Sequence, residues 1–546
     1  MKKIINLISA LILSTLLLVS CGEKDDEKKL TPQQQFTTTI QKSISGNAKT
    51  VTNGLLTAYK EIDLTNYGDE LAISFKLGDS FAALLHSYLE ENLGNISTSW
   101  CKSAQVGLKT QIVGNSIKLD VTAGVNDTNI ISANIVEDTN SSTVYISIPE
   151  LIKKTFKVSG NDFGISFSNY YTQYFAYLSF LSTIPDEAVF TTCIDEILSA
   201  ITTPVTNIER SKEIISAGMN SGKSVSAEYT ALSTVIDSEL GEKIAKAAYS
   251  AIKTNNSLNT ILNWFIPEIA MLSGESIRVK DVTNELAEAV ADVINDAFLY
   301  GKVKLTFYVD KQSKLAGTRI TMLNSYDDEK EGEFFVAMPQ KGSEFGYICS
   351  FDDTTETFNL VSGYGSYSGG KMTGDFVVSS PENEQLVAFE TKNLNITDLK
   401  SFKFNGTVTV HPAETIRQVI QEELMYEVDS SLASIASVFD FSITAEQKDY
   451  KSIKADIMLS VEKEPYATLT VKSSMNKPTA FSVPTTDIIM VDEDIAEHLD
   501  IIASSISTQT IAQNLKKAKV PDEYVQQVSN IDGNTLMEYV EDEFYY

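Results

Sequence analysis

The sequence predicts an α+β protein in which a large, curved, antiparallel sheet with a half-barrel-like meander is packed with helices, beside a smaller N-terminal sheet lobe. Beyond residue 301, apolar and polar residues alternate in one short segment after another, as in antiparallel strands with one buried face. Residues 150–300 instead contain Leu-, Ala- and Ile-rich stretches of helical length. Strands joined by short turns and segregated from the helices favour an α+β architecture.

The first lobe is expected to begin with a helix over 36–59, where apolar residues recur at helical spacing. Strict alternation then predicts three strands, at 71–77, 117–121 and 144–148. A helix is expected between the first two of these strands, over 79–93. The lobe ends at Pro149.

The middle of the chain is expected to be mostly helical, with proline and glycine residues separating the helices. The predicted helical stretches are 178–181, 194–216, 240–252, 258–272 and 282–299. Alternation over 224–235 predicts one strand among them.

A long meander follows, and its predicted strands are 303–309, 315–323, 333–338, 345–351, 357–361, 372–378, 385–391 and 401–410. Pro412 is placed at the first position of a helix that runs to about residue 437. Three further strands are expected at 439–445, 452–461 and 468–473. Asp492 is expected to cap a final helical region.

These elements divide the chain into six parts. They are a signal peptide (1–20), a lipidated cysteine with a polar tether (21–35), an N-terminal α+β lobe (36–150), a mostly helical segment (151–300), an antiparallel β-meander with one long helix (301–490) and a C-terminal helical region (491–546).

The N-terminus carries a signal for export. Met1-Lys2-Lys3 precedes an apolar run from Ile4 to Val19, which is shorter than the about 20 residues of a spanning helix. Leu18-Val19-Ser20-Cys21 resembles the lipobox of bacterial lipoproteins. The resemblance implies that Cys21 is acylated and becomes the first residue of the mature protein, anchored by chains that contribute about 0.8 kcal/mol per buried CH₂.

Gly22 to Lys29 contains no apolar residue and is interpreted as a solvated tether. The expected location is therefore the extracytoplasmic face of the cell membrane. Lys24-Asp25-Asp26 is also similar to the acidic signal that sends lipoproteins of some Bacteroidota to the cell surface, although a plain hydrophilic spacer explains these residues equally well. The outer membrane or cell surface of a diderm is the alternative location.

Composition excludes several partners and cofactors. The formal net charge of −29 repels phosphate, which argues against nucleic acid and against a polybasic membrane surface. Besides Cys21, the cysteines are Cys101, Cys193 and Cys349, whose number and spacing predict neither a disulfide framework nor a metal or redox pair. No cofactor is expected.

Motifs that carry chemistry are weak. Residues 217–224 (AGMNSGKS) fit a loose P-loop pattern, but the expected order, a helix before and a strand after, is the reverse of a nucleotide site. His86, His411 and His498 lie in a helix, at a strand end and in an acidic helix, without a GxSxG elbow. The acidic runs 327–329 and 492–494 lack the glycine and distal glutamate of a calcium loop. The sequence thus predicts a protein with no catalytic or metal-binding residues.

Residues 163–181 form the most distinctive stretch, with eight aromatic side chains. At helical spacing one stripe gathers five of them: Phe163, Phe167, Tyr170, Tyr174 and Tyr177. Aromatic faces line acyl cavities and stack on sugars, while such a stripe also packs into ordinary cores. This stripe is the candidate wall of a ligand site.

Three short segments carry a further resemblance: YISIPEL at 145–151, YVDK at 308–311 and LKKAKVP at 515–521. With the order of the predicted parts, they resemble a family of uncharacterised lipoproteins from Gram-positive anaerobes. The resemblance implies no functional residue. It favours a plasma membrane over an outer membrane as the location of the protein. The predicted half-barrel is also similar to lipoprotein carriers of the localisation-factor and mycobacterial glycolipid-carrier type, whose sheet and helices enclose an acyl cavity.

The expected function is therefore that of a non-catalytic, membrane-anchored lipoprotein that binds an apolar ligand such as a lipid or glycolipid. Its expected partners are the membrane, through the acyl chains on Cys21, and that ligand, with no nucleic acid and no nucleotide. The alternative is a cell-envelope scaffold or adhesion protein that binds other proteins or glycans.

Overall fold

The computed structural model describes most of the chain from residue 30 to residue 535. The described residues are 30–60, 66–79, 81–83, 86–87, 97–159, 180, 183–219, 222–274, 276–298, 301–324, 326–382, 384–424, 439–461, 463–491 and 499–535. They form two compact units, and each unit is built from segments that are distant in the sequence. Unit 1 comprises residues up to Thr57 and Thr183–Val438, and unit 2 comprises Ala58–Ser182 and Phe439–Tyr546.

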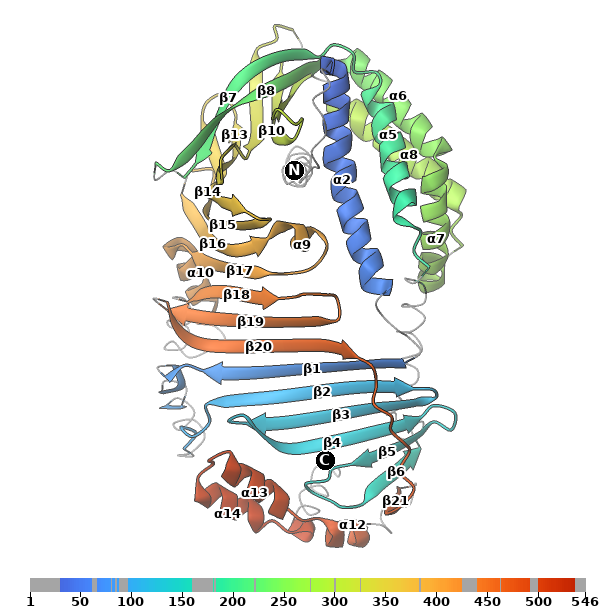
Figure 1. Cartoon of the computed structure of the whole chain (residues 1–546), viewed down its shortest axis with the longest axis vertical. Helices are drawn as coiled ribbons and strands as arrows, with labels where there is room; N and C mark the ends of the chain where they lie inside the picture. Colours follow the sequence, from blue (N-terminus) through green and yellow to red (C-terminus); the bar gives the residue numbers. More distant parts are fainter. Residues whose placement is uncertain are drawn as a thin grey trace. The chain divides into compact units, whose positions relative to one another are not determined.

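Unit 1 combines long helices with a meander of strands (Figure 1). Its helices are α2 (Pro32–Lys60), α5 (Glu187–Thr202), α6 (Ser238–Thr254), α7 (Asn256–Ser273), α8 (Val279–Phe298), α9 (Ile396–Lys400) and α10 (Glu414–Leu424). Its strands are β7 (Glu209–Gly218), β8 (Ser224–Ile236), β9 (Lys302–Val309), β10 (Leu315–Leu323), β11 (Lys330–Ala337), β12 (Gln340–Lys341), β13 (Glu344–Asp352), β14 (Thr357–Ser368), β15 (Lys371–Ser379), β16 (Gln385–Asn395) and β17 (Gly406–Pro412).

The strands of unit 1 pair antiparallel in chain order from β7 to β17, except that β11 pairs with β13 and the short β12 pairs with the start of β13. The sheet curls enough to bring β7 against β13. At this contact a Cβ on Gly346 would lie 1.8 Å from the backbone oxygen of Ala217, so only glycine fits.

Helices cover one face of unit 1 at β8–β10. Leu232, Phe307 and Val309 point from this face into a core that also contains Phe36 of α2 and Ile244 of α6. The rings of Phe36 and Phe307 lie 5.1 Å apart. The amphipathic pattern of α6 places Ile244, Ala248 and Ile252 among its buried residues and its paired Lys and Glu side chains in solvent.

Unit 2 is mainly a sheet, in which the N-terminal strands form a central block with C-terminal strands on both sides. Its strands are β1 (Asn66–Leu77), β2 (Ser103–Val113), β3 (Ser116–Val125), β4 (Thr128–Asp138), β5 (Thr143–Ser147), β6 (Thr155–Ser159), β18 (Asp440–Glu446), β19 (Ser452–Val461), β20 (Glu464–Asn476) and β21 (Ile488–Val491). The order is β18-β19-β20-β1-β2-β3-β4-β5-β6-β21, and β21 pairs with β6 in parallel.

Three C-terminal helices lie beside the β4–β6 end of unit 2 (Figure 1): α12 (Leu499–Ser505), α13 (Gln509–Lys517) and α14 (Asp522–Ser529). Asn126 fixes α13 to the sheet, because its amide donates to the carbonyls of Trp100 and Ala518 at 2.8 and 2.9 Å. Asn126 and Asp127 both have positive φ in the tight β3–β4 turn, which asparagine and aspartate tolerate. Asn514 adds a bond to the carbonyl of Ile130 at 3.2 Å.

The α+β class with a large curved, mainly antiparallel sheet is confirmed, but three local predictions are wrong. The strand expected at 401–410 begins only at Gly406, because residues 401–405 form the connection that follows α9. Residues 209–216 were expected to be helical, but they form the strand β7, in which buried Ile215 and Ala217 alternate with exposed side chains. Pro412 ends β17 instead of opening a helix, and α10 begins at Glu414. The predicted helix at 79–93 is helical at 79, 81–83 and 86–87 and otherwise lies outside the described residues, as does the cap at Asp492.

The core under α2 and α6 gives a prediction for stability. Leu232→Ala removes a fully buried side chain and leaves a cavity, so we expect the free energy of unfolding of unit 1 to fall by about 2–5 kcal/mol. Val235→Ala on the same strand, where the side chain is 46% exposed, is the matched control and should cost less than about 1 kcal/mol. Urea unfolding followed by circular dichroism measures both, and equal losses would contradict the assignment of the core.

Candidate functional site

The strands of unit 2 direct most of their apolar side chains to one face and most of their polar side chains to the other. Residues paired directly across antiparallel strands point to the same face, so the register identifies each face. One face, called here the apolar face, is made mainly of Phe441, Ile443, Ala445, Ile453, Ala455, Ile457, Leu459, Ala467, Leu469, Val471, Leu71, Ile73, Phe75, Ala104, Val106, Leu108, Ile112, Ile117, Leu119, Val121, Ala123, Val125, Ile131, Ala133 and Ile135. The register also places four polar residues on this face: Asp69, Thr110, Glu137 and Ser473.

The opposite face is polar. Lys118 and Asp120 form an ion pair on β3 at 3.0 Å, and Lys454 and Asp456 form another on β19 at 3.0 Å. The carboxylate of Asp456 also accepts a hydrogen bond of 2.6 Å from the hydroxyl of Thr470 on β20. The ion pairs and hydroxyl groups thus satisfy one another on this face, where the side chains of Lys118 and Asp120 are only 24% and 20% exposed.

Helix α12 covers one end of the apolar face. Here Val144, Val158 and Val491 form a buried cluster with Ile152, and Ile135 and Ile502 pack against it. An isolated bridge between Ile152 and Ile506 holds the chain around α12 to this end of the sheet. The β4–β6 end of the face is therefore an ordinary protein core.

The middle of the same face is open to solvent. Ile73 and Phe75 on β1 are 36% and 38% exposed, and Val106 on β2 is 45% exposed. Ile73 lies directly opposite Val106 on one side and Val471 on the other. None of the described helices packs extensively against β1, β2, β19 or β20. Adjacent apolar side chains left in water on a long sheet are typical of a surface that another molecule covers.

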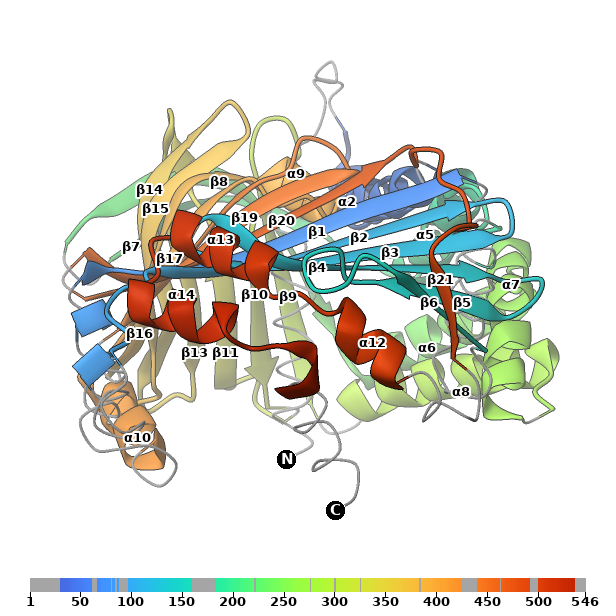
Figure 2. The ribbon, with the colours of Figure 1, turned by 90° about the horizontal axis from the view of Figure 1, so that it is seen from below.

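Figure 1 and Figure 2 both show β1–β4 as long strands that lie side by side. The right-handed twist of such strands curves the sheet. Across β20, β1 and β2, an elongated apolar molecule can contact the side chains around Ile73 and Phe75 without meeting a charged group, whereas Asp69 lies further along β1 on the same face. The open middle of the apolar face is the candidate functional site.

The sequence-predicted site residues lie outside the described residues. These are the lipidation site Cys21 and the aromatic stripe of Phe163, Phe167, Tyr170, Tyr174 and Tyr177. Two statements therefore stay predictions: that the aromatic stripe forms a wall of a ligand site, and that Cys21 is acylated and anchors the protein. The apolar face itself was missed, although alternation of apolar residues from Ala104 to Ile112 signals β2, a strand that the sequence analysis omitted.

The described residues of the segment 217–224, which resembles a P-loop, lie in the β7–β8 hairpin. The residues on either side of this segment pair as antiparallel strands, and Gly222 has a φ of 96°. A phosphate loop needs the N-terminus of a following helix, whereas β8 follows here. The sequence pattern also suggests Gly218 as the stop of a helix and Gly222 as a turn residue. The first expectation is wrong, because Gly218 ends the strand β7, whereas Gly222 lies in the turn.

The histidines in the described residues have local partners. Nδ1 of His86 lies 2.8 Å from the hydroxyl of Thr98, and Nε2 of His411 lies 3.7 Å from Glu390 on the neighbouring strand. His498 lies outside the described residues. Within the described part of the chain, no group of three or more His, Cys, Asp or Glu side chains is placed to hold a metal ion.

Two carboxylates of unit 1 face each other across an arginine. Glu213 accepts hydrogen bonds from the hydroxyl of Tyr308 at 3.0 Å and from Arg319 at 3.4 Å. Glu333 pairs with Nε of Arg319 at 3.5 Å and accepts from the hydroxyl of Thr321 at 3.1 Å. Burial raises the pKa of Tyr308, which keeps its hydroxyl a donor. Both acids thus have fixed cationic and hydroxyl partners, an arrangement that ties β7, β9, β10 and β11 together.

Among the helices that the structure describes, none combines the length and apolar character needed to cross a membrane. In comparisons with known proteins, no family model and no curated protein matches the chain. Functional assignment therefore depends on the chemistry of the described surfaces.

The free cysteines give a prediction about accessibility. Burial raises the pKa of Cys349 to about 12, and burial with the nearby Glu196 raises the pKa of Cys193. At about pH 8, a thiol with a pKa near 12 is ionised to only about 1 part in 10,000. Iodoacetamide should therefore modify the half-exposed Cys101 before Cys193 or Cys349 in the folded protein.

Peptide mapping by mass spectrometry, with urea-unfolded protein as the reference for full reactivity, measures this order. Modification of Cys349 as fast as Cys101 under native conditions would contradict the burial of β13.

Proposed function

We propose that the protein is a membrane-anchored, extracytoplasmic lipoprotein that binds an apolar ligand, such as a lipid or glycolipid, on the apolar face of unit 2. The observation that carries the proposal is the open middle of that face around Ile73, Phe75 and Val106. The N-terminal pattern that ends in Cys21 supports the anchor. The proposed role is non-catalytic, because binding needs only burial of apolar surface.

The energetics favour an acyl chain as the ligand. Burial contributes about 0.8 kcal/mol per methylene, so contact with about eight methylenes gains roughly 6 kcal/mol before ordering costs. A chain lying across β20, β1 and β2 meets Leu469, Phe75 and Ala104, which the register aligns in one row. The next row aligns Val471, Ile73 and Val106. Two parallel apolar rows suit a ligand with long, flexible hydrocarbon chains.

A charged side chain in these two apolar rows should weaken the binding of an apolar ligand. We expect Ile73→Asp to weaken the binding of a fluorescent long-chain fatty acid by about tenfold or more, because the ligand would bury a carboxylate. Ser74→Asp is the matched control, since the adjacent residue points to the polar face, and its affinity should stay within about twofold of the unchanged chain.

Fluorescence titration measures the affinities, and circular dichroism checks that both variants fold. Equal affinity of the two variants would contradict an apolar ligand on this face. Absence of any fatty-acid binding to the unchanged chain would favour the alternative, a scaffold or adhesion protein whose apolar face is covered by another protein.

The anchor is tested separately through Cys21. Cys21→Ser removes the thiol that the lipobox pattern marks for acylation, so we expect the protein to leave the membrane fraction or to stay unprocessed. Fractionation with metabolic labelling by a palmitate analogue measures both effects. Labelling that is unchanged in the variant would refute acylation at this position.

A further inference from the structure

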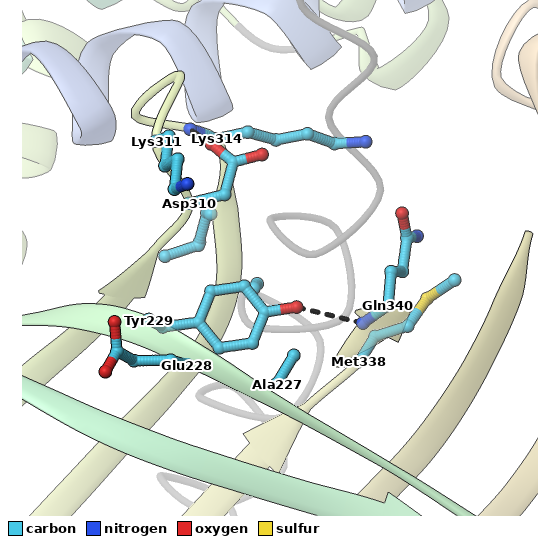
Figure 3. A pocket seen from close by; sticks show the side chains of 10 residues that line it. Ala227, Glu228, Tyr229, Asp310, Lys311, Lys314, Met338 and Gln340 are labelled. Atoms are coloured by element: carbon cyan, nitrogen blue, oxygen red, sulfur yellow. Dashed lines mark hydrogen bonds between the residues drawn. The ribbon is translucent and has the colours of Figure 1, made fainter. Parts of the chain in front are cut away.

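The charges in a polar pocket of unit 1 balance one another. This pocket lies between β8, the β9–β10 turn and the residues around β12 (Figure 3). Lys311 and Lys314 line it, and so do the acids Asp310 and Glu228. Cations and acids are therefore equal in number there, whereas the turn that follows α9 leaves apolar side chains in water.

The turn after α9 exposes two large apolar side chains. Leu399 is 44% exposed and Phe402 is 55% exposed. The backbone N–H of Phe402 donates to the carbonyl of Leu399 at 3.1 Å, so both residues belong to one tight turn. Together they form a small apolar projection, which differs from the single exposed apolar residues that are normal on protein surfaces.

Phe402 occupies a backbone position that normally belongs to glycine. Its φ is 60°, in the left-handed region. The N–H of Lys403 donates to the carbonyl of Asp398 at 2.8 Å, which together with the bond from Phe402 to Leu399 gives the Schellman arrangement that ends many helices. Glycine is the usual residue at its left-handed position, because a Cβ strains the backbone there. A bulky aromatic residue at a strained position points to a role for its side chain.

Polar contacts hold this turn in place. The side chain of Asn395 caps α9 by accepting two of its backbone N–H groups, each at 3.1 Å. The carboxylate of Asp398 pairs with Lys403 at 3.3 Å, and Lys400 donates to the side chain of Asn47 on α2 at 2.6 Å. The two lysines are thus engaged within the protein, so the apolar side chains are the part of the turn that remains for a partner.

The anchor proposed at Cys21 brings a bilayer within reach of this turn. Eleven steps of chain (32 − 21 = 11) join Cys21 to Pro32 at the start of α2, and they span about 40 Å at most. The turn lies against α2 at Asn47, about 23 Å along the helix from Pro32. Phe and Leu side chains insert at the boundary between headgroups and acyl chains, whereas a net charge of −29 opposes attraction to anionic lipid.

We propose that the turn after α9 inserts Leu399 and Phe402 into the surface of the lipid bilayer and so orients the anchored protein. The inference rests on the proposed anchor at Cys21, because the anchor supplies the bilayer. The acyl chains hold the protein, and the turn determines which side of unit 1 faces the lipid. This contact is separate from ligand binding on the apolar face of unit 2.

Tryptophan fluorescence tests the insertion on the full-length protein, reconstituted in phosphatidylcholine vesicles with and without brominated acyl chains. The emission of Phe402→Trp should move to shorter wavelength and lose intensity to the bromine, because the indole lies among the acyl chains. Tyr326→Trp is the matched control, since Tyr326 belongs to another turn of unit 1 and is 96% exposed. Its emission should match in both kinds of vesicle, after subtraction of the signal that Trp100 and Trp264 give in the unchanged chain.

Phe402→Gly separates membrane contact from folding. Glycine relieves the left-handed strain, so the melting temperature followed by circular dichroism should not fall. In a chain that carries Leu399→Trp as the probe, the same change should reduce bromine quenching by about twofold or more, because one of two inserted side chains is lost. Ile214→Ser removes an exposed apolar side chain from β7 instead, and it should leave the quenching of this probe unchanged.

The outcomes separate the turn from the anchor. Equal quenching at residues 402 and 326, or none at residue 402 in a protein that mass spectrometry shows to be acylated, would overturn the membrane contact alone. So would a melting temperature that Phe402→Gly lowers, since Phe402 would then serve the fold. A protein without acyl chains on Cys21 would overturn the anchor and this inference together.

Discussion

The two-residue period of the β-strand is the constraint on which unit 2 depends. Along β1, successive side chains point to opposite sides, so Ile73 and Phe75 share one face while Ser74 and Lys76 share the other. The antiparallel register carries this division from strand to strand, and a slip by one residue would exchange the faces. The register therefore creates a continuous apolar surface, and the stability of the unit in water depends on what covers it.

The two units cover their apolar surface differently. In unit 1, α2 and α6 supply Phe36 and Ile244 to the strands, and the core side chains there are almost fully buried. In unit 2, α12 covers the β5–β6 end, while Ile73 and Val106 stay open among the described residues. A sheet that leaves such residues in water gives up stabilisation of about 25 cal/mol per Å² of apolar surface. An apolar ligand recovers that free energy on binding, which links the geometry to the proposed function.

Local patterns predicted most of the strands because each has its own alternation, as in 303–309 and 452–461. They failed at β7, where Glu209, Arg210 and Lys212 favour a helix by propensity. Pairing with β8 overrides this preference, because it buries Ile215 and leaves Ile214 73% exposed. Pairing of β1 with β20, about 400 residues away in sequence, has no local signal. The candidate site depends on that pairing, so no local pattern predicts it, whereas the aromatic stripe at 163–177 is visible in the sequence alone.

The central claim is that the apolar face binds a lipid or glycolipid, and native mass spectrometry of the Cys21→Ser chain, purified from its own cells without added lipid, tests it most directly. This variant lacks the thiol that would be acylated, so a bound lipid cannot be confused with the anchor. The account predicts a bound mass in the range of a lipid or glycolipid, which organic solvent removes and which Ile73→Asp reduces. A chain that is purified folded, carries no such mass and takes up none from lipid vesicles would contradict it.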